Sequence, residues 1–348
     1  MAIPATAPRQ RIVVADDSAF MRKQLVDVLV SANFDVVAEA GNGDEAVALC
    51  QKLQPDAMTL DLAMPGLDGV QVLRTLTGEG DRALPIVVVS AFSPKTSSRA
   101  MDALTQGAFD FVAKPATPEA RRAFIKELSE KVALAAASAP VGWAPQQQVS
   151  QNTAAPAQRS IQKHAVVIAS STGGPRALAT LLPLLPSPLG AGGMVVQHMP
   201  AGFTRSLAAR LDATCKLKIR EAAPGDDILP DTLLFAPGGN HLRLGQNRRT
   251  YFSHEQVPNG LCPLADFTIL DAVERFGSRI VLAVLTGMGR DGLEGARAVK
   301  KRGGTVLAQD ERSCTVFGMS RAVVEAGLAD EILSLDDLAV AIAREAGA

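Results

Sequence analysis

Short runs of β-branched and other apolar residues alternate with helix-like segments along almost the whole of this 348-residue chain. The first runs include RIVVADD at 11–17, AMTLDL at 57–62 and PIVVVSAF at 85–92. Segments between them, such as FMRKQLVDVLVSA at 20–32, carry apolar residues at the helical spacing of about 3.6 residues. Strands that alternate with helices form a parallel sheet with helices on both faces. The pattern therefore predicts an α/β fold.

The alternation is interrupted by residues 137–162, ASAPVGWAPQQQVSQNTAAPAQRSIQ, which are rich in Ala, Pro, Gln and Ser. A segment with so few large apolar residues cannot bury enough surface to order itself, and it is typical of a linker. We therefore predict two domains, at 1–136 and 163–348, in keeping with roughly 100–200 residues per domain. Both can bury a core, since 47% of the residues are apolar and 20% are charged.

The composition excludes several classes of protein. A net charge of −1 argues against a protein that binds nucleic acid through bulk electrostatics. No apolar run approaches the length of about 18 residues that a membrane span needs. The N-terminal MAIPATAPRQR has no apolar signal core, and the four cysteines lie far apart without a C-x-x-C motif. We expect a soluble, cytoplasmic protein that binds no nucleic acid and inserts into no membrane.

In residues 1–136, polar side chains stand where the predicted strands end. Asp16 and Asp17 end the first strand, Asp61 the third, Ser90 the fourth and Lys114 the fifth. Ligands of parallel sheets bind at the carboxyl ends of the strands, so these residues should share one rim. Three carboxylates repel each other unless a cation lies among them, and such hard oxygen ligands suit Mg²⁺. A lysine and a serine hydroxyl can hold the oxygens of a phosphoryl group.

The segments ADD, TLDLAMPGLDG, VVVS and FVAKP are similar to those of response-regulator receiver domains, across the whole of 1–136. The resemblance implies a CheY-like, doubly wound sheet of five strands, with Asp61 as the phospho-accepting residue. It also implies Mg²⁺ bound by Asp61, by Asp17 directly, by Asp16 through water and by the backbone carbonyl of Ala63.

The same resemblance assigns Ser90 and Lys114 to the phosphoryl group. It places Phe111 at the aromatic switch position of receiver domains. A plain core aromatic is an equally good interpretation of Phe111.

Residues 163–348 show α/β alternation as well. The predicted strands are HAVVIAS at 164–170, GGMVVQH at 192–198, RIVLAVLT at 279–286 and GGTVLAQD at 303–310. A further strand in LLFAPGG, with a hairpin over 241–255, is inserted into the pattern. We therefore predict a second, Rossmann-like α/β domain with a mainly parallel sheet.

A serine, a histidine and an aspartate follow three of these strands. Ser170 and Ser171 end the first, His198 follows the next and Asp291 lies in LTGMGRDG after a third. A parallel sheet brings them to one rim, where His198 can take a serine proton and Asp291 can orient the imidazole. Of the chain's four histidines, His241 in PGGNHL is the serious rival to His198.

The Ser-Thr-Gly-Gly turn after the first strand allows two interpretations. A phosphate cradle at this turn is disfavoured, because the turn itself, SSTGGP at 170–175, carries neither G-x-G-x-x-G nor G-x-x-x-x-G-K-[ST]. The glycines instead let backbone amides approach an oxyanion, with Thr172 and the MGRDG loop as candidate donors. The order Ser…His…Asp and the absence of G-x-S-x-G exclude a standard α/β-hydrolase.

Residues 163–348 resemble the catalytic domain of the chemotaxis methylesterases, the CheB family. The segments that carry the resemblance are SSTGGP, QHMPAGFTRSLAARL, LFAPGGNHL, LTGMGRDG and CTVFGMSRAV. It implies Ser171 as nucleophile, His198 as base, Asp291 as its partner, and oxyanion contacts from the backbone amides of Thr172 and Met288.

The family resemblance also implies a reaction and its partners. The expected substrates are methyl-accepting chemotaxis receptors, whose glutamate methyl esters would be hydrolysed to glutamate and methanol, with deamidation of receptor glutamines alongside. The expected phosphodonor is the chemotaxis histidine kinase CheA. Mg²⁺ would serve the receiver domain, and ester hydrolysis would need no cofactor.

Two positions depart from the family pattern. Ser170 stands where an alanine is common, which leaves a second hydroxyl beside the expected nucleophile. The family's Pro-Ser-Val-Asp segment is Pro263-Leu264-Ala265-Asp266 here, so Asp266 matches and the serine is lost.

A receiver joined to an enzyme by a linker implies control by phosphorylation. The resemblance implies that the unphosphorylated receiver covers the esterase cleft and that phosphorylation of Asp61 uncovers it. Three alternatives are a module that only docks partners, a DNA-binding response regulator and a nucleotide-binding output domain. The Ser-His-Asp set argues against the docking module, and the α/β alternation with its near-neutral charge argues against the DNA-binding regulator. The absence of a phosphate motif at the serine turn argues against the nucleotide-binding domain.

Overall fold

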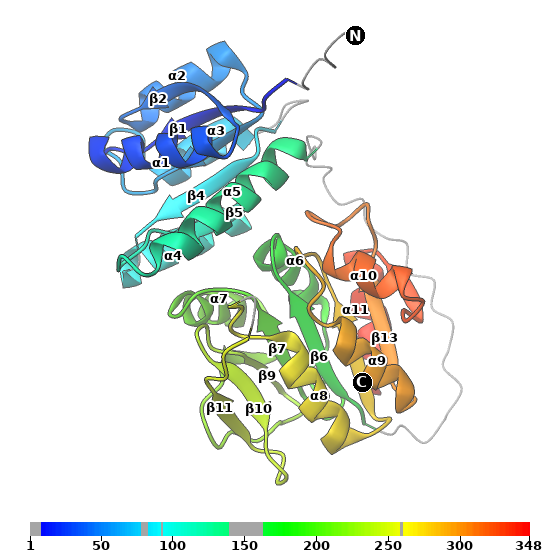
Figure 1. Cartoon of the computed structure of the whole chain (residues 1–348). Helices are drawn as coiled ribbons and strands as arrows, with labels where there is room; N and C mark the ends of the chain where they lie inside the picture. The colour runs from blue at the N-terminus through cyan, green and yellow to red at the C-terminus, as the bar shows by residue number, and fades with distance from the viewer. Residues whose placement is uncertain (1–7, 78–82, 92, 139–162, 258–259) are drawn as a thin grey trace. The chain divides into compact units, whose positions relative to one another are not determined.

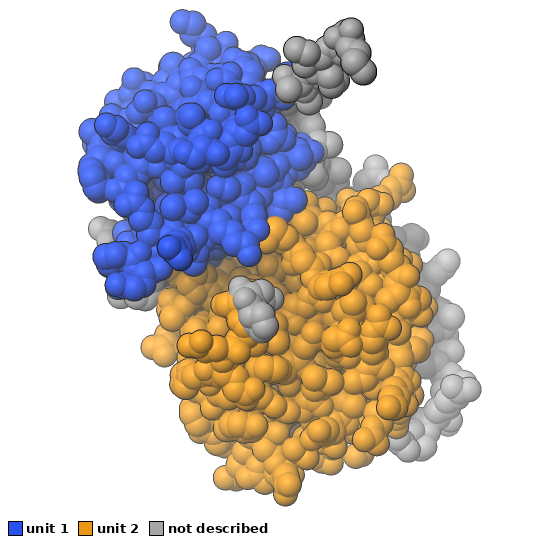
Figure 2. Space-filling model, in the orientation of Figure 1, with its two compact units in different colours: residues 1–146 blue, residues 147–348 orange. Residues whose placement is uncertain are grey.

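The computed structural model describes residues 8–77, 83–91, 93–138, 163–257 and 260–348. The chain forms two compact units, Met1–Gln146 and Gln147–Ala348 (Figures 1 and 2). Of the predicted linker at 137–162, only Ala137 and Ser138 are described, and they end a helix and cap it. The remainder of the linker lies outside the described residues.

The first unit is a five-stranded parallel sheet in the order β2-β1-β3-β4-β5 (Figure 1). Helices α1 and α5 pack together on one face, and α2, α3 and α4 cover the other. This confirms the predicted doubly wound fold. The strands are β1 Arg11–Ala15, β2 Asp35–Ala40, β3 Ala57–Leu60, β4 Ile86–Ser90 and β5 Asp110–Ala113. The helices are α1 Ala19–Ser31, α2 Gly43–Leu53, α3 Gly69–Thr77, α4 Pro94–Thr105 and α5 Arg121–Ala137.

Local sequence explains where these elements begin. Strands β3 and β4 are apolar or small throughout and buried at every position, as expected for a sheet covered on both faces. Ser18 caps α1 by accepting from the backbone N–H of Met21, and Asn42 caps α2 by accepting from that of Glu45. The cap of α1 immediately follows the aspartates that end β1, so the rim is a tight strand-to-helix turn.

The second unit is a seven-stranded sheet in the order β14-β13-β12-β6-β7-β9-β8, and every pair in it is parallel. Helices α6, α7 and α11 lie on one face and α8, α9 and α10 on the other. The strands are β6 Ala165–Ser170, β7 Gly193–Gln197, β8 Lys218–Glu221, β9 Thr232–Phe235, β12 Ile280–Val284, β13 Thr305–Gln309 and β14 Glu331–Leu333. The helices are α6 Gly174–Leu181, the 3₁₀ turn Leu182–Leu184, α7 Phe203–Asp212, α8 Ala265–Phe276, α9 Leu293–Lys301, α10 Met319–Glu325 and α11 Leu335–Ala346.

The predicted hairpin is present as the antiparallel pair β10 His241–Leu244 and β11 Thr250–Ser253, separate from the main sheet. It packs against α8. The mainly parallel sheet and the inserted hairpin confirm the predicted fold of this unit.

Within the described ranges, no helix is both long enough and apolar enough to cross a membrane. The four cysteines, Cys50, Cys215, Cys262 and Cys314, are free thiols.

Candidate functional site

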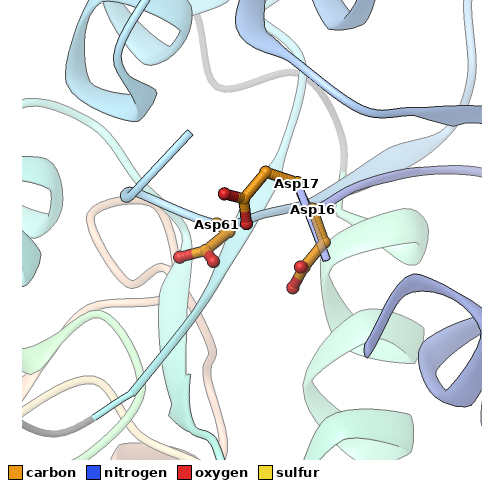
Figure 3. Close-up of side chains that lie close together, drawn as sticks. All are labelled: Asp16, Asp17 and Asp61. Carbon is orange, nitrogen blue, oxygen red and sulfur yellow. The ribbon is translucent and has the colours of Figure 1, made fainter. Parts of the chain in front are cut away.

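Three carboxylates meet at the carboxyl edge of the first sheet. Asp16 and Asp17 follow β1 and Asp61 follows the neighbouring β3, and one ligand oxygen from each lies within 4.8 Å of the others (Figure 3). Lys114 follows β5 and reaches across the rim, with its Nζ 2.7 Å from Asp16 Oδ2 and 2.6 Å from Asp61 Oδ2. Ser90 is the last residue of β4 and lies on the same edge. Its buried Oγ has no hydrogen-bond partner among the described residues.

The charges at this rim are balanced by burial and pairing. Burial raises the pKa of Asp16, and the hydrogen bond from Lys114 only partly offsets that rise. Burial alone would lower the pKa of Lys114, but its bonds to Asp16 and Asp61 outweigh burial and raise it. Oxygen-only ligands, one of them on the exposed Asp17, fit a hard divalent cation that keeps bound water. The residues present therefore suit Mg²⁺.

Phe111, at the predicted switch position, is 2% exposed and lies in β5. Lys131 of α5 contacts it twice: its Nζ donates to the Phe111 carbonyl at 2.8 Å and lies 5.5 Å from the ring centroid. The same Nζ lies 2.8 Å from Glu127 Oε1 and 3.3 Å from Asp110 Oδ2. Sequence reasoning did not identify Lys131, because its role depends on α5 packing against β5.

In the second unit, three adjacent strands bring the serine turn, the histidine and the aspartate to one edge. The strand order β12-β6-β7 places Asp291 beyond β12, Ser171 beyond β6 and His198 beyond β7. The backbone N–H of His198 donates to the Ser170 carbonyl at 3.0 Å, and that of Ser171 donates to the Thr286 carbonyl at 3.0 Å.

His198 and Asp291 form a buried pair. The Nε2 of His198 lies 2.7 Å from Oδ2 of Asp291, and the two side chains are 7% and 5% exposed. Asp291 also accepts backbone N–H bonds from Ala265 at 2.6 Å, Asp266 at 3.0 Å and Gly292 at 2.9 Å. Burial would raise the pKa of Asp291, but the His198 and backbone hydrogen bonds outweigh it and lower that pKa. The aspartate therefore stays ionised beside the imidazole.

The serine turn and the loop that approaches it contain glycines at positions where a Cβ would collide with a neighbouring residue. Gly173 has a φ of +76°, and a Cβ there would lie 2.3 Å from Thr315 Cβ. A Cβ on Gly287, in the loop after β12, would lie 2.7 Å from Ser171 Cβ. Thr172 is 2% exposed and its carbonyl accepts from Thr286 Oγ1 at 2.9 Å, whereas Met288 is 36% exposed. Gly287 thus lets the loop after β12 approach Ser171, and Gly173 lets Thr315 approach the serine turn.

Gln197 joins the two strand ends, and sequence reasoning did not single it out. Its Nε2 donates to the Ser171 carbonyl at 2.9 Å and to the His198 carbonyl at 3.0 Å. Its Oε1 accepts from Ser170 Oγ at 2.7 Å. The extra hydroxyl of Ser170 is therefore used to orient this amide. The sequence offered one sign of a role for Gln197, namely its position directly before His198.

His241, the rival histidine, is fully buried with both ring nitrogens engaged by backbone groups. Its Nδ1 accepts from the Leu264 N–H at 3.0 Å, so its Nε2 carries the proton and donates to the Glu255 carbonyl at 2.9 Å. Neither nitrogen is left to take a proton from a serine. The ring instead holds the residue just before α8, whose first backbone N–H groups bind Asp291.

Comparison with known proteins identifies the family of each unit. Residues 166–342 match the family described as CheB methylesterase, and residues 12–126 match the response regulator receiver domain. A protein-glutamate methylesterase/protein-glutamine glutaminase 1 of Syntrophomonas wolfei is 38% identical over 345 residues, covering 95% of this chain and 97% of that protein.

A protein-glutamate methylesterase/protein-glutamine glutaminase of Thermotoga maritima is 40% identical over 329 residues, covering 93% of this chain and 94% of that protein. The crystal structure of the Thermotoga maritima CheB methylesterase catalytic domain superposes with a TM-score of 0.50 at 44% identity. That match covers 52% of this chain and 98% of the solved domain. The resemblance to CheB proteins predicted from the sequence motifs is confirmed.

Proposed function

Because this chain belongs to the CheB methylesterase family and carries a response regulator receiver domain, we propose that it is a protein-glutamate methylesterase of chemotaxis. It hydrolyses glutamate γ-methyl esters on methyl-accepting chemoreceptors to glutamate and methanol. The observation that carries this proposal is the buried pair of His198, which follows β7, and Asp291, which lies in the loop after β12. The two side chains are 2.7 Å apart, and Ser171 follows β6, the strand between β7 and β12.

The proposed reaction transfers the glutamyl acyl group to Ser171 and then to water. Asp291 accepts a hydrogen bond from the Nε2–H of His198, which leaves the lone pair of Nδ1 to take the hydroxyl proton of Ser171. The Ser171 Oγ then attacks the ester carbonyl, and the oxyanion accepts from the backbone amides of Thr172 and Met288. The C–O bond to the methoxy group breaks, and methanol leaves with the proton that His198 held. Water, deprotonated by His198, hydrolyses the acyl-enzyme and restores glutamate and the free serine.

The same steps accommodate a glutamine side chain. The tetrahedral intermediate then loses ammonia rather than methanol, and the identical acyl-enzyme is hydrolysed to glutamate. Relatives of this chain are named as both methylesterases and glutaminases. We therefore propose deamidation of receptor glutamines as a second activity of the same residues.

The first unit supplies the control. We propose that Asp61 accepts a phosphoryl group from the chemotaxis histidine kinase CheA in the cytoplasm. Ser90 and Lys114 would hold the phosphoryl oxygens, which gives a partner to the buried Ser90 hydroxyl. Asp16, Asp17, Asp61 and the Ala63 carbonyl would hold Mg²⁺, which supplies charge neutralisation at the incoming phosphate.

A pair of neighbouring serine variants tests the proposed nucleophile. Methanol release is measured from methylated chemoreceptor membranes for the wild-type chain, Ser171→Ala and Ser170→Ala. Ser171→Ala should lose at least ~10³-fold in kcat, whereas Ser170→Ala, which loses one hydrogen bond to Gln197, should lose less than about tenfold. The reverse order would move the nucleophile to Ser170. No release by the wild type would overturn the methylesterase assignment.

A further inference from the structure

A second aspartate lies beside Asp291 and takes part in a reciprocal contact between two helix starts. The backbone N–H of Asp266, in the first turn of α8, donates to Asp291 Oδ1 at 3.0 Å. The side chain of Asp266 accepts from the N–H of Gly295, in the first turn of α9, at 2.7 Å. Asp291, just before α9, thus binds the start of α8, while Asp266, inside α8, binds the start of α9.

Both helices depend on this exchange because neither has a side-chain cap of its own. The N-cap positions of α8 and α9 are Leu264 and Gly292, and neither forms a side-chain capping bond. The first amides of a helix need acceptors from outside it. The helices also pack tightly, since a Cβ on Gly295 would lie 2.6 Å from Ile269 Cγ2. Asp266 therefore helps to fix the loop that ends in Asp291.

Most of the charge that faces Asp266 is negative. Asp291 and Glu294 lie on the loop before α9 and on α9 itself. From the hairpin, His241 is engaged by backbone groups and Arg243 pairs with Asp271 through two bonds of 2.7 and 3.0 Å. Strands β6, β7 and β12, which also pack on α8, carry no titratable side chain, and His198 follows β7.

These surroundings determine when Asp266 is charged. Burial, followed by the charge of Asp291, raises the pKa of Asp266 to about 7. Asp266 therefore changes charge in the same pH range in which a histidine base must lose its proton.

We propose that Asp266 is a positioning residue that sets the proton affinity of His198 through Asp291, and thereby the pH range of ester hydrolysis. This inference rests on the proposed function. An ionised Asp266 adds negative charge near Asp291, and this charge favours the protonated form of the His198 imidazole over the neutral form. Removing that charge favours the neutral imidazole, which is the form that can take the serine proton.

The direct test is an NMR titration of the full chain labelled at the Cε1 of its four histidines, with His198→Asn used to assign the His198 signal. Asp266→Asn keeps an oxygen for the Gly295 N–H but carries no charge. It should lower the pKa of His198 by roughly half a unit to one unit. Glu274→Gln, which removes one charge from an exposed side chain of the same helix, should leave it unchanged. An unshifted His198 in Asp266→Asn, with the His241 signal as in the wild type, would overturn the inference.

Activity separates this inference from the proposed function. In Asp266→Asn the acid limb of kcat/KM for methanol release should move to lower pH by the same shift, whereas Asp266→Ala should also lose kcat because α9 loses its cap. Identical acid limbs for the wild type and Asp266→Asn would overturn the inference while the methylesterase assignment stands. A shifted His198 in a chain that releases no methanol would support the coupling and overturn the assignment.

Discussion

At the scale of single residues, Gln197 connects the candidate nucleophile to the candidate base. Its amide donates to the carbonyls of Ser171 and His198, and its oxygen accepts from Ser170. These bonds fix the backbone of both strand ends before any substrate is present. Placement to within a fraction of an ångström is what acyl transfer requires of such groups.

Replacing this amide with groups of similar size should therefore slow the reaction. Gln197→Met leaves the two partly buried carbonyls without this donor, and should cost about 1–3 kcal/mol of stability and ~10- to 100-fold in kcat, with little change in KM. Gln197→Glu should be more damaging at neutral pH, because a carboxylate would face the same two carbonyl oxygens. Chemical denaturation and methanol-release kinetics measure the two effects. Equal kcat for the wild type and both variants would contradict the positioning role.

The sequence was sufficient to predict Ser171, His198 and Asp291 as neighbours but not Gln197. Polar residues after apolar runs identify strand ends, and a parallel sheet collects those ends on one edge. The contacts of Gln197 depend instead on the register that pairs it with Ser170 across β6 and β7. The interpretation of His241 likewise needed the structure, because its two partners come from Glu255 and Leu264.

At the scale of elements, the loop between β12 and α9 determines how closely Asp291 and Met288 approach the serine turn. Gly287 is its tightest point, since an added Cβ would lie 2.4 Å from Met319 Sδ and 2.7 Å from Ser171 Cβ. The methionine can rotate away, but the serine Cβ is fixed by its own backbone. A side chain at this position must push the loop and the nucleophile apart.

Gly287→Ala should therefore reduce kcat by about 10²-fold, the loss expected when reacting groups are displaced by about 1 Å. The matched control is Gly245→Ala in the hairpin turn, where the nearest atom is Asn247 Oδ1 at 3.1 Å and the backbone is not left-handed. Methanol release and thermal unfolding are compared for both variants. Wild-type kcat in Gly287→Ala would show that the close approach is not needed.

The strands that sequence reasoning missed lie at the edges of the second sheet. Strands β8 and β14, with the sequences KIRE and EIL, have four and three residues and stay partly exposed. An edge strand is covered less than a central one, so its sequence lacks the continuous apolar run by which β6, β7 and β12 were predicted. The central strands, which carry the site, were therefore the predictable ones.

At the scale of the whole molecule, each unit has its own sheet, its own core and its own site. Lys114 bridges Asp16 and Asp61 in one unit, and the His198–Asp291 pair lies in the other. Control by phosphorylation requires that the charge state of the first site changes the population of active forms of the second. A receiver domain in the same chain as the esterase is the reason to expect such coupling.

The coupling gives a prediction that separates the two units. With a small-molecule phosphodonor and Mg²⁺, methanol release by the full chain should rise about tenfold, which corresponds to ~1.4 kcal/mol of coupling. Asp61→Asn, which keeps the shape of the acceptor but cannot form the acyl phosphate, should show the unstimulated rate with and without the donor. A chain restricted to 163–348 should not respond to the donor. If the receiver covers the esterase cleft, as the family resemblance implies, this shorter chain should also release methanol faster than the unphosphorylated full chain. If that shorter chain were no faster, the receiver would control the esterase by activating it and not by covering it.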